Sequence, residues 1–422
     1  MMRSDSKLRV LYIVYWGASE PLGQSLVLPS VKRLADLGVE LTLVTFEKPE
    51  DLARQEVMSA IRVGLDEHGI RWIPLRYHKY PKVPATAYDI GRGLASGIMA
   101  GLRERPDVIH ARTFVGGLIG LVLAPLVGAR LIYHNEGFYP DEQVDGGVWK
   151  ANSAPHRLAT WLERRMYSRA DAIVSMSHRG KRVIEGLMGV SRKGIPVIVV
   201  PSCVDLSHFR WNPTARASEP GTLRLVYVGS VGGRYIFNKV GEFAALARQE
   251  IGAIRLRVLT PADPAVVASM LSKSGLAQNA WSVDKVPHSV MPGELESQDA
   301  GLFFLSQGLS EHGCSPTKIG EYWAMGLPVI TTPNVSDTDE IIRQDRVGVV
   351  VEGHSDDDYR RAVRELQLLL QDTDLPFRCR RAAERHYALE PACERQLALY
   401  HSLVPRMAQA AVQASASELG NS

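Results

Sequence analysis

The amino-acid sequence predicts an α/β fold with two Rossmann-like, doubly wound parallel sheets. Strand-like and amphipathic helix-like segments alternate along the first half of the chain, as is typical of parallel sheets with helices on both faces. A polar stretch rich in Pro, Ala, Ser and Gly interrupts this alternation at 210–222, and the same alternation then restarts. Ligands of such sheets bind at the carboxyl ends of the strands, so the predicted active site is a cleft between the two facing halves.

The first half begins with an apolar strand at 8–16 and an amphipathic helix at 24–38, which ends at Gly38 because glycine is a common helix stop. The pattern predicts the further strands of this half at 39–47, 70–75, 107–111, 130–134, 171–177 and 196–202. It predicts helices near 51–68, 86–104, 114–127 and 154–169.

The uncharged run from Thr113 to Ala129 raises the question of a membrane span. Its 17 residues fall short of the roughly 20 that a spanning helix needs, and Pro125 and four glycines interrupt it. A run this short between two strands usually packs on a sheet. We therefore expect a buried crossover helix. The basic helix at 156–169 is compatible with docking on a membrane surface, although internal packing is its expected role.

The second half repeats the alternation and ends in a helix. Its strands are predicted at 223–230, 254–260, 280–286, 300–306, 327–332 and 347–352. The resulting domains are an N-terminal domain at 1–205, a linker at 206–222, a C-terminal domain at 223–388, a helix at 389–409 that packs back towards the N-terminal domain, and a flexible tail at 410–422.

Composition and charge narrow the class of protein. The net charge of +3 over 422 residues does not indicate nucleic-acid binding, and it permits an acidic small ligand or an anionic membrane surface. The four cysteines form no CxxC pair, which indicates a reducing compartment without disulfides. The N-terminal apolar run is too short and interrupted for a signal peptide. A cytoplasmic protein is expected.

The stretch "SPTKIGEYWAMGLPVITT" (315–332) has the features of an anion site. It follows a strand and a loop of small polar residues, and Pro316 fits the first turn of a helix. The free N–H groups of such a helix attract phosphate, and Lys318 in that turn opposes the helix dipole unless an anion is bound. Glu321 lies on the same face and could accept hydrogen bonds from ribose hydroxyls. A solvated Lys–Glu pair on a surface helix explains the pattern equally well.

The same stretch resembles the nucleotide-sugar site of GT-B glycosyltransferases, in particular the retaining family 4 (group 1) enzymes. Further segments resemble that family in the family's order, and they lie at 22–50, 108–142, 162–184, 199–213 and 225–233. The resemblance implies a GT-B fold with an acceptor-binding N-terminal domain and a nucleotide-sugar-binding C-terminal domain. It also implies a nucleotide-diphospho-sugar, such as a UDP-sugar, as co-substrate and no other cofactor.

Residue by residue, the resemblance implies a donor site and departs from the family at two positions. Glu321 matches the second of two family glutamates and would hold the ribose, whereas Gly313 stands where the first is usual and Glu311 is a conceivable substitute. Ser230 stands where the family has an arginine, with Arg234 and Lys239 nearby as candidate cations or as plain surface charges. The expected donor-binding residues are Gly17, Gly23, Gly229, Ser230, Arg234, Lys239, Ser315, Pro316, Thr317, Lys318 and Glu321.

On the acceptor side, His110 ends the strand at 107–111, where a histidine is well placed for a ligand in this architecture. The resemblance implies that it contacts the acceptor or the donor sugar. It is equally often a structural residue. The expected catalytic residues are His110, Lys318 and Glu321, and the expected acceptor-binding residues are Arg112, His134 and Glu136. The D-x-D in "SDTDE" (336–340) has the spacing of a metal-bound diphosphate site, but Ser336 or Asp337 is expected to cap a helix. No metal is expected.

We therefore expect a retaining, hexosyltransferase-type enzyme that moves a sugar from a nucleotide-diphospho-sugar to an acceptor hydroxyl. The acceptor would be a carbohydrate or a lipid-linked intermediate of bacterial polysaccharide, lipopolysaccharide or glycolipid synthesis. The enzyme would work in the cytoplasm, and an association with the cytoplasmic face of the inner membrane is compatible with the sequence. The departures Gly313 and Ser230 keep open a non-catalytic scaffold that binds nucleotides, and the fold keeps open a nucleotide-sugar epimerase.

Overall fold

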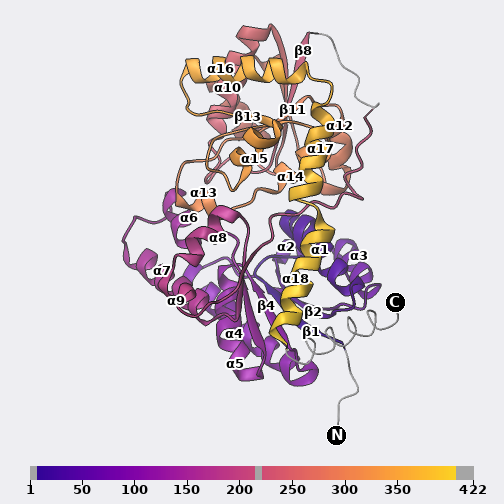
Figure 1. The fold of residues 1–422 in the computed structure, drawn as a ribbon, viewed down its shortest axis with the longest axis vertical. Helices are drawn as coiled ribbons and strands as arrows, with labels where there is room; N and C mark the ends of the chain where they lie inside the picture. Colours follow the sequence, from indigo (N-terminus) through magenta and orange to yellow (C-terminus); the bar gives the residue numbers. More distant parts are fainter. Residues whose placement is uncertain (1–6, 214–220, 405–422) are drawn as a thin grey trace, which may run out of the picture.

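The structure is a computed structural model that describes residues 7–213 and 221–404, and it confirms the predicted fold class. Two parallel sheets, each with helices packed against it, follow one another along the long axis of the molecule (Figure 1). The predicted linker 206–222 lies partly outside the described residues, and the predicted tail 410–422 lies wholly outside them.

The N-terminal sheet has seven parallel strands in the order β3-β2-β1-β4-β5-β6-β7. The strands are β1 (Arg9–Val14), β2 (Glu40–Glu47), β3 (Arg71–Arg76), β4 (Val108–Arg112), β5 (Arg130–His134), β6 (Ala172–Ser175) and β7 (Val197–Val199). Because the strand order reverses between β1 and β4, a topological switch point lies at their carboxyl ends. The register pairs Tyr12 with His110 there.

Helices cover both faces of this sheet. They are the π-helical turn η1 (Gly23–Val27), α1 (Leu28–Asp36), α2 (Pro49–Leu52), α3 (Gln55–Asp66), α4 (Lys82–Glu104), α5 (Phe114–Val127), α6 (Tyr139–Asp145), α7 (Ala154–Arg169), α8 (His178–Glu185) and α9 (Met188–Ser191). One hydrophobic cluster packs α1, α3 and the C-terminal helix on one face, and a second packs α4, α5 and α7 on the other.

The C-terminal sheet has six parallel strands in the order β10-β9-β8-β11-β12-β13. The strands are β8 (Thr222–Val228), β9 (Ala253–Leu259), β10 (Trp281–Asp284), β11 (Ala300–Leu302), β12 (Val329–Thr331) and β13 (Gly348–Val350). The helices are α10 (Phe237–Ile251), α11 (Pro264–Lys273), η2 (Gln278–Ala280), η3 (His288–Val290), α12 (Met291–Glu296), α13 (Leu309–Gly313), α14 (Thr317–Ala324), α15 (Thr338–Asp345), α16 (Asp356–Leu370), α17 (Leu375–His386) and α18 (Leu389–Leu403).

Helix α18 leaves the C-terminal domain and returns to the N-terminal one (Figure 1). Its buried Cys393 and Tyr400 belong to the hydrophobic cluster that α1 and α3 cover. A polar contact also ties this helix to the N-terminal sheet, since the Tyr400 hydroxyl lies 2.7 Å from His110 Nδ1. Residues 405–409 of the predicted C-terminal helix lie outside the described residues.

Helix α5 joins β4 to β5 as a crossover, but it is only partly buried. Ile119 and Leu123 are fully buried, whereas Val122 and Leu126 are 47% and 63% exposed. The expectation of a buried crossover helix therefore holds for one side of α5 only. Within the described residues, no helix is both long and apolar enough to cross a membrane.

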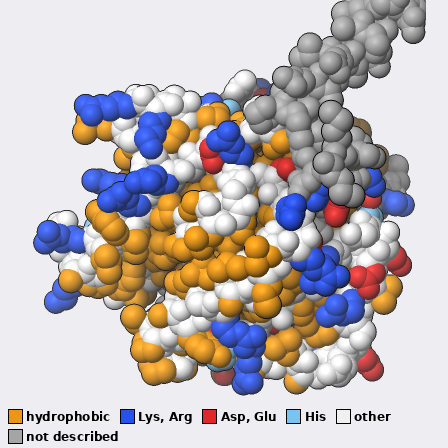
Figure 2. Space-filling model, turned by 90° about the horizontal axis from the view of Figure 1, so that it is seen from below, with side chains coloured by type: hydrophobic (Ala, Val, Ile, Leu, Met, Phe, Trp, Pro, Cys, Tyr) orange, Lys and Arg blue, Asp and Glu red, His pale blue; other side chains and the backbone are white. Residues whose placement is uncertain are grey.

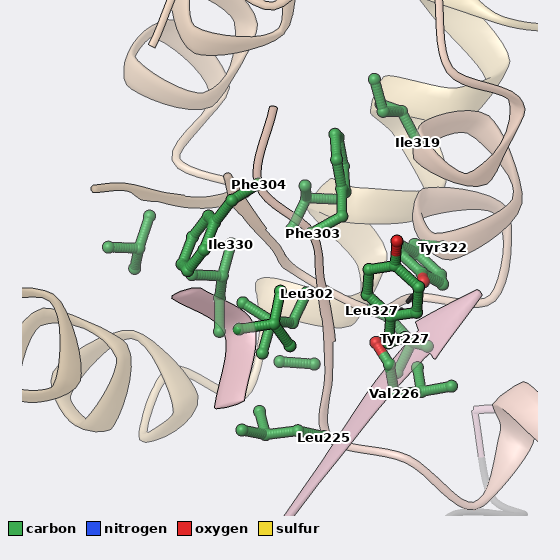
Figure 3. Packing of buried hydrophobic residues seen from close by; sticks show 14 of the residues in the cluster. Leu225, Val226, Tyr227, Leu302, Phe303, Phe304, Ile319, Tyr322, Leu327 and Ile330 are labelled. Carbon is green, nitrogen blue, oxygen red and sulfur yellow. Dashed lines mark hydrogen bonds between the residues drawn. The ribbon is translucent and has the colours of Figure 1, made fainter. Parts of the chain in front are cut away.

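Helix α14 lies unusually close to its sheet because a glycine faces it from β11. A Cβ on Gly301 would lie 2.1 Å from the Tyr322 ring, so the ring occupies the space that any side chain at 301 would need. The Val228 N–H donates to the Tyr322 hydroxyl at 2.9 Å. Figure 3 shows Tyr322 beside Tyr227 and Leu327 in this core. The contact between Gly301 and Tyr322 thus sets the height of α14 above the strands.

Substituting Gly301→Ala is expected to destabilise the protein by about 1–3 kcal/mol, because the added methyl group overpacks a rigid ring. The matched control is Gly91→Ala on the exposed side of α4, where a Cβ meets no atom within 4 Å. Alanine there removes backbone freedom from the unfolded chain and should stabilise by about 0.5–1 kcal/mol. Urea denaturation of both variants measures the difference, and equal midpoints would contradict the role assigned to Gly301.

Candidate active site between the two domains

The loops that follow the strands of both sheets meet at the domain interface. Asp337 of the C-terminal domain binds the start of helix α8 in the N-terminal domain. The N–H groups of His178 and Arg179 donate to the Asp337 carboxylate at 2.7 and 3.0 Å. Arg179 also binds Asp339, at 2.7 Å. The D-x-D segment is therefore an interdomain contact. Asp337 stands at the N-cap of α15 but makes no side-chain capping bond there, which corrects the expectation that it caps its own helix.

A second contact joins α13 to α6. The Ser310 hydroxyl lies 2.7 Å from Asp145 Oδ2, and Arg234 forms an ion pair with Glu142 at 3.2 Å. Burial raises the pKa of Glu142, and Arg234 opposes this rise. Glu142 is thus partly buried against Arg234.

Gly313 lies inside this contact. A Cβ at this position would lie 2.9 Å from the Phe138 ring and 3.3 Å from Gly137 Cα. A glutamate at 313, as in the resembling family, would therefore require α13 to move away from the N-terminal domain. Glu311, two residues earlier, is fully buried and lies near Ser306, Ser310 and Arg234 at 3.1, 3.0 and 3.7 Å.

Lys318 is buried in the first turn of α14 and is 3% exposed. Its Nζ lies 3.8 Å from the ring centre of Tyr235 and 5.0 Å from those of Tyr227 and Phe303. No hydrogen-bond partner for Nζ is found among the residues that the structure describes. Burial lowers the pKa of Lys318 to about 7. The ammonium is therefore held by aromatic faces and lacks a counter-charge in contact with it.

Gly229 packs directly against the Lys318 side chain. A Cβ there would lie 2.9 Å from Lys318 Nζ, and the backbone has a φ of +121°, which side chains rarely adopt. Both restrictions require glycine at the carboxyl end of β8. The neighbouring Ser230 is exposed, and its carbonyl accepts a hydrogen bond from the Tyr227 hydroxyl.

Glu321 lies one turn after Lys318 and is 5% exposed. Its Oε1 accepts a hydrogen bond from Nε2 of His288, in η3, at 3.1 Å. Sequence reasoning missed His288, because it stands in a short loop far along the chain and no motif surrounds it. The contact shows that Glu321 faces the loop after β10 and is not a solvated surface residue.

The remaining donor-side residues make contacts of their own, separate from the aromatic contacts of Lys318. Lys239 pairs with its helix neighbour Glu242 at 2.7 Å. The Ser202 N–H donates to the Ser315 hydroxyl at 3.0 Å, which ties the start of α14 to the segment that leaves the N-terminal domain. Pro316 is the N-cap of α14 and Thr317 its first residue.

Gly17 and Gly23 pack against each other in the loop after β1. A Cβ on Gly23 would lie 2.1 Å from the Gly17 carbonyl oxygen, and one on Gly17 would lie 2.7 Å from Glu47 Oε2. The Glu47 carboxylate accepts from the Ala18 N–H at 2.7 Å and from the Ser19 hydroxyl at 2.9 Å. These contacts make the loop a tightly packed turn.

The predicted acceptor residues form one buried network at the switch point. His110 is fully buried, with its ring stacked on Tyr12 at 4.4 Å. Its Nδ1 and Nε2 lie 2.7 Å from the Tyr400 hydroxyl and 2.9 Å from His134 Nδ1. His134 Nε2 has no hydrogen-bond partner among the described residues and lies 3.9 Å from Glu136 Oε1.

The protons of this network have one consistent arrangement. Burial lowers the pKa of His110 to about 3 and that of His134 well below its ordinary value, so both rings are neutral. If Tyr400 donates to His110, then His110 Nε2–H donates to His134, and the His134 Nε2–H is left facing the Glu136 carboxylate. The opposite order would set a lone pair against that carboxylate. The chain of donors therefore runs from α18 towards Glu136.

Arg112 completes the network. It forms an ion pair with Glu136, and its Nη1 lies 3.4 Å from the Tyr12 hydroxyl. It also lies over the Trp16 ring at 5.7 Å. Arg112 is 3% exposed, so among the predicted acceptor residues Glu136, whose side chain is 18% exposed, is the most accessible. The network holds Glu136 from two sides.

Comparisons with known proteins agree with this architecture. Residues 26–203 match the family of glycosyl transferase 4-like domains. A D-inositol 3-phosphate glycosyltransferase of Paenarthrobacter aurescens (strain TC1) is 24% identical over 348 residues, which are 79% of this chain and 81% of that protein.

Solved structures match the whole fold. Sucrose-phosphate synthase from Thermosynechococcus elongatus has a TM-score of 0.71 at 15% identity, over 94% of this chain and 99% of that one. Anabaena HepE in complex with UDP and glucose has a TM-score of 0.63 at 12% identity, over 94% of this chain and 100% of that one. The chain thus has the GT-B fold of two facing Rossmann-like domains, its N-terminal half matches a glycosyl transferase 4-like domain, and these likenesses support a group 1 (family 4) glycosyltransferase.

Proposed function

We propose that the chain transfers a hexose from a nucleotide-diphospho-sugar to an acceptor hydroxyl with retention at the anomeric carbon. The observation that carries the proposal is the buried ammonium of Lys318, which lacks a hydrogen-bond partner among the described residues and lies in the first turn of a helix whose next turn presents Glu321. A buried cation without a counter-charge destabilises the fold, and a bound anion would remove that penalty. A diphosphate fits this requirement.

In this proposal the diphosphate lies between Gly229 and the start of α14. As the bond between the sugar and the phosphate breaks, negative charge grows on the leaving phosphate, and preorganised positive charge lowers the barrier. Lys318 and the free N–H groups of α14 would supply that charge, with Arg234 nearby. The leaving phosphate would take the proton of the attacking hydroxyl on the same face of the sugar. These groups supply the charge without a metal ion in the proposed reaction.

Glu321 would hold the ribose hydroxyls, with His288 orienting its carboxylate. Glu311 would take the part of the family glutamate that Gly313 lacks, because it is buried beside Arg234 at the same interface. On the N-terminal side, Glu136 would meet the acceptor. His110 touches neither substrate in this arrangement and acts as a positioning residue that links Tyr400 to His134.

We further propose a UDP-sugar donor and an acceptor from bacterial cell-envelope polysaccharide or glycolipid synthesis, used at the cytoplasmic side of the membrane. The HepE structure, which holds UDP and glucose, supports the first part. A thermal-shift screen of the purified chain against UDP, GDP, CMP and several nucleotide sugars tests the donor, since a ligand that binds the folded state raises its apparent stability. A shift with UDP or a UDP-sugar alone is expected. No shift with any nucleotide would favour a scaffold without nucleotide chemistry.

Glu321→Gln is expected to weaken nucleotide-sugar binding by about 10–100-fold, because it removes a charge-assisted hydrogen bond worth about 1.5–3 kcal/mol. Isothermal titration with the donor found in the screen measures the effect. The control is Glu365→Gln, an exposed glutamate of α16 in the same domain. Equal affinities of the two variants would contradict the role of Glu321.

Lys318→Met should leave the free protein as stable or make it about 1 kcal/mol more stable, because it removes a buried amine without a partner. It should also abolish donor binding. Loss of stability together with retained binding would show that the aromatic contacts of Lys318 are purely structural.

The pH dependence follows from the lowered pKa of Lys318, which is about 7 against an ordinary value of 10.5. Between these values the unfolded chain binds more protons than the folded one, so this residue's contribution to the free energy of unfolding increases as pH rises. Donor binding favours the protonated amine, so the affinity for a UDP-sugar should fall by up to about tenfold per pH unit above pH 7. Titrations between about pH 7 and 9 measure this slope, and an affinity that stays constant would contradict it.

A further inference from the structure

Helices α4, α5 and α7 cover one face of the N-terminal sheet and leave many large apolar side chains in solvent. We call their outer surface the α4–α5–α7 face. Met99 and Leu102 of α4 are 66% and 72% exposed, Leu126 of α5 is 63% exposed, and Trp161 of α7 is 52% exposed. Further exposed apolar residues of these helices are Val83, Tyr88, Val122 and Leu158. Single exposed apolar residues are ordinary, whereas so many on three packed helices mark an interaction surface.

The fold does not need these side chains. Helix α4 packs on α5 through the glycines Gly93, Gly97 and Gly101, where a Cβ would lie 2.4–2.6 Å from Ile119, Leu123 and Val127. The inner sides of both helices are thus filled by close contact. A surface helix normally turns polar residues outward, but α5 contains no charged residue at all. The apolar outer side of α5 is therefore better explained by binding to another surface than by packing within the fold.

The exposed charges on these helices are mainly positive. Seven lysines and arginines stand on them against three carboxylates. Asp89 and Glu163 are buried, and Glu104 binds Arg71. The cations are Lys82, Arg92, Arg103, Arg157, Arg164, Arg165 and Arg169, all of them exposed. Within the described part of the chain, no ion pair involves these seven side chains.

The view from below looks onto the end of the N-terminal domain where Figure 1 places α4 and α5. Figure 2 shows hydrophobic side chains gathered there, with lysines and arginines among and around them and few carboxylates. Between α5 and α7 the surface is hollowed by about 470 Å³, with Leu121, Pro125, Leu162, Trp161 and Arg165 in its lining. Arg165 stacks over Trp161 at 5.1 Å.

We propose that the α4–α5–α7 face docks on the surface of an anionic lipid bilayer. Apolar side chains would enter the boundary between headgroups and acyl chains, Trp161 would lie at the interface, and the unpaired cations would meet lipid phosphates. A second copy of the chain fits poorly, because a two-fold contact would set the same seven cations against one another. A protein partner with a neutral surface would leave those cations without a counter-charge.

The face also reaches the candidate active site. Helix α4 begins just after the carboxyl end of β3, and its buried Asp89 accepts a hydrogen bond from Tyr15, directly after β1, at 2.8 Å. The face thus runs up to the edge of the sheet at which the acceptor residues lie. If the acceptor is lipid-linked, as the proposed function has it, docking would bring that edge to the lipid surface.

Co-sedimentation of the full chain with vesicles of phosphatidylcholine alone, or of phosphatidylcholine with phosphatidylglycerol, tests the proposal. We expect binding to the anionic vesicles only, and weaker binding as salt is added. The triple variant Arg164→Gln, Arg165→Gln, Arg169→Gln should lower the partition coefficient about fivefold for each cation removed. The double variant Leu102→Glu, Leu126→Glu should abolish binding.

The matched control is Val63→Glu with Leu368→Glu, which are 58% and 69% exposed on other helices, and it should bind as the unaltered chain does. Absence of binding to anionic vesicles, or equal loss in the control, would overturn the proposal. So would a dimer in solution that the double variant dissociates, since the face would then join two copies. Thermal shift with the donor nucleotide in each variant reports folding and donor binding separately, so failure of docking is distinguished from failure of the proposed function.

Discussion

The arrangement of the two domains depends on a close backbone contact between two glycines, one from each domain. Gly313 in α13 lies against Gly180 in α8, where a Cβ on Gly180 would be 3.1 Å from Gly313 Cα. Because the backbones touch, α13 also reaches α6, and α15 reaches the free N–H groups at the start of α8. The ion pairs from Arg179 to Asp339 and from Arg234 to Glu142 also join the two domains. Any larger residue at 313 would separate these partners.

The packing around Gly313 also bears on its departure from the pattern of the glycosyltransferases that the sequence resembles. A glutamate at 313 would collide with Phe138, whereas Glu311, two residues earlier in the same short helix, is a fully buried carboxylate. The arginine that is usual at position 230 is also absent, while Arg234 stands at the interface with Glu142. Under the proposed function, Glu311 and Arg234 would carry these charges at the boundary between the domains. Donor binding and the closeness of the domains would then be linked through the same charges.

Lys318 and the α4–α5–α7 face have one property in common. Each is unfavourable for the stability of the protein when nothing is bound to it. Among the residues that the structure describes, the ammonium has no counter-charge in contact with it, and the cations beside the exposed apolar area form no ion pair. Groups of this kind persist where a ligand or a surface completes them. An anion would complete the first and an anionic bilayer the second. His110 shows the opposite case, because both of its ring nitrogens are already paired within the chain.

The fold class and the position of the donor helix follow from local pattern. Alternating apolar segments specify two parallel sheets, and the small polar loop before Lys318 and Glu321 specifies a helix start at the end of a strand, since both signals lie within a few residues of one another. The partners of those residues could not be predicted in this way. His288 meets Glu321 from 33 residues away, Tyr400 meets His110 from 290 residues away, and Asp337 meets α8 from the other domain. Such pairs are decided by the packing of distant elements, because a side chain's neighbours across an interface leave no periodicity in its own segment.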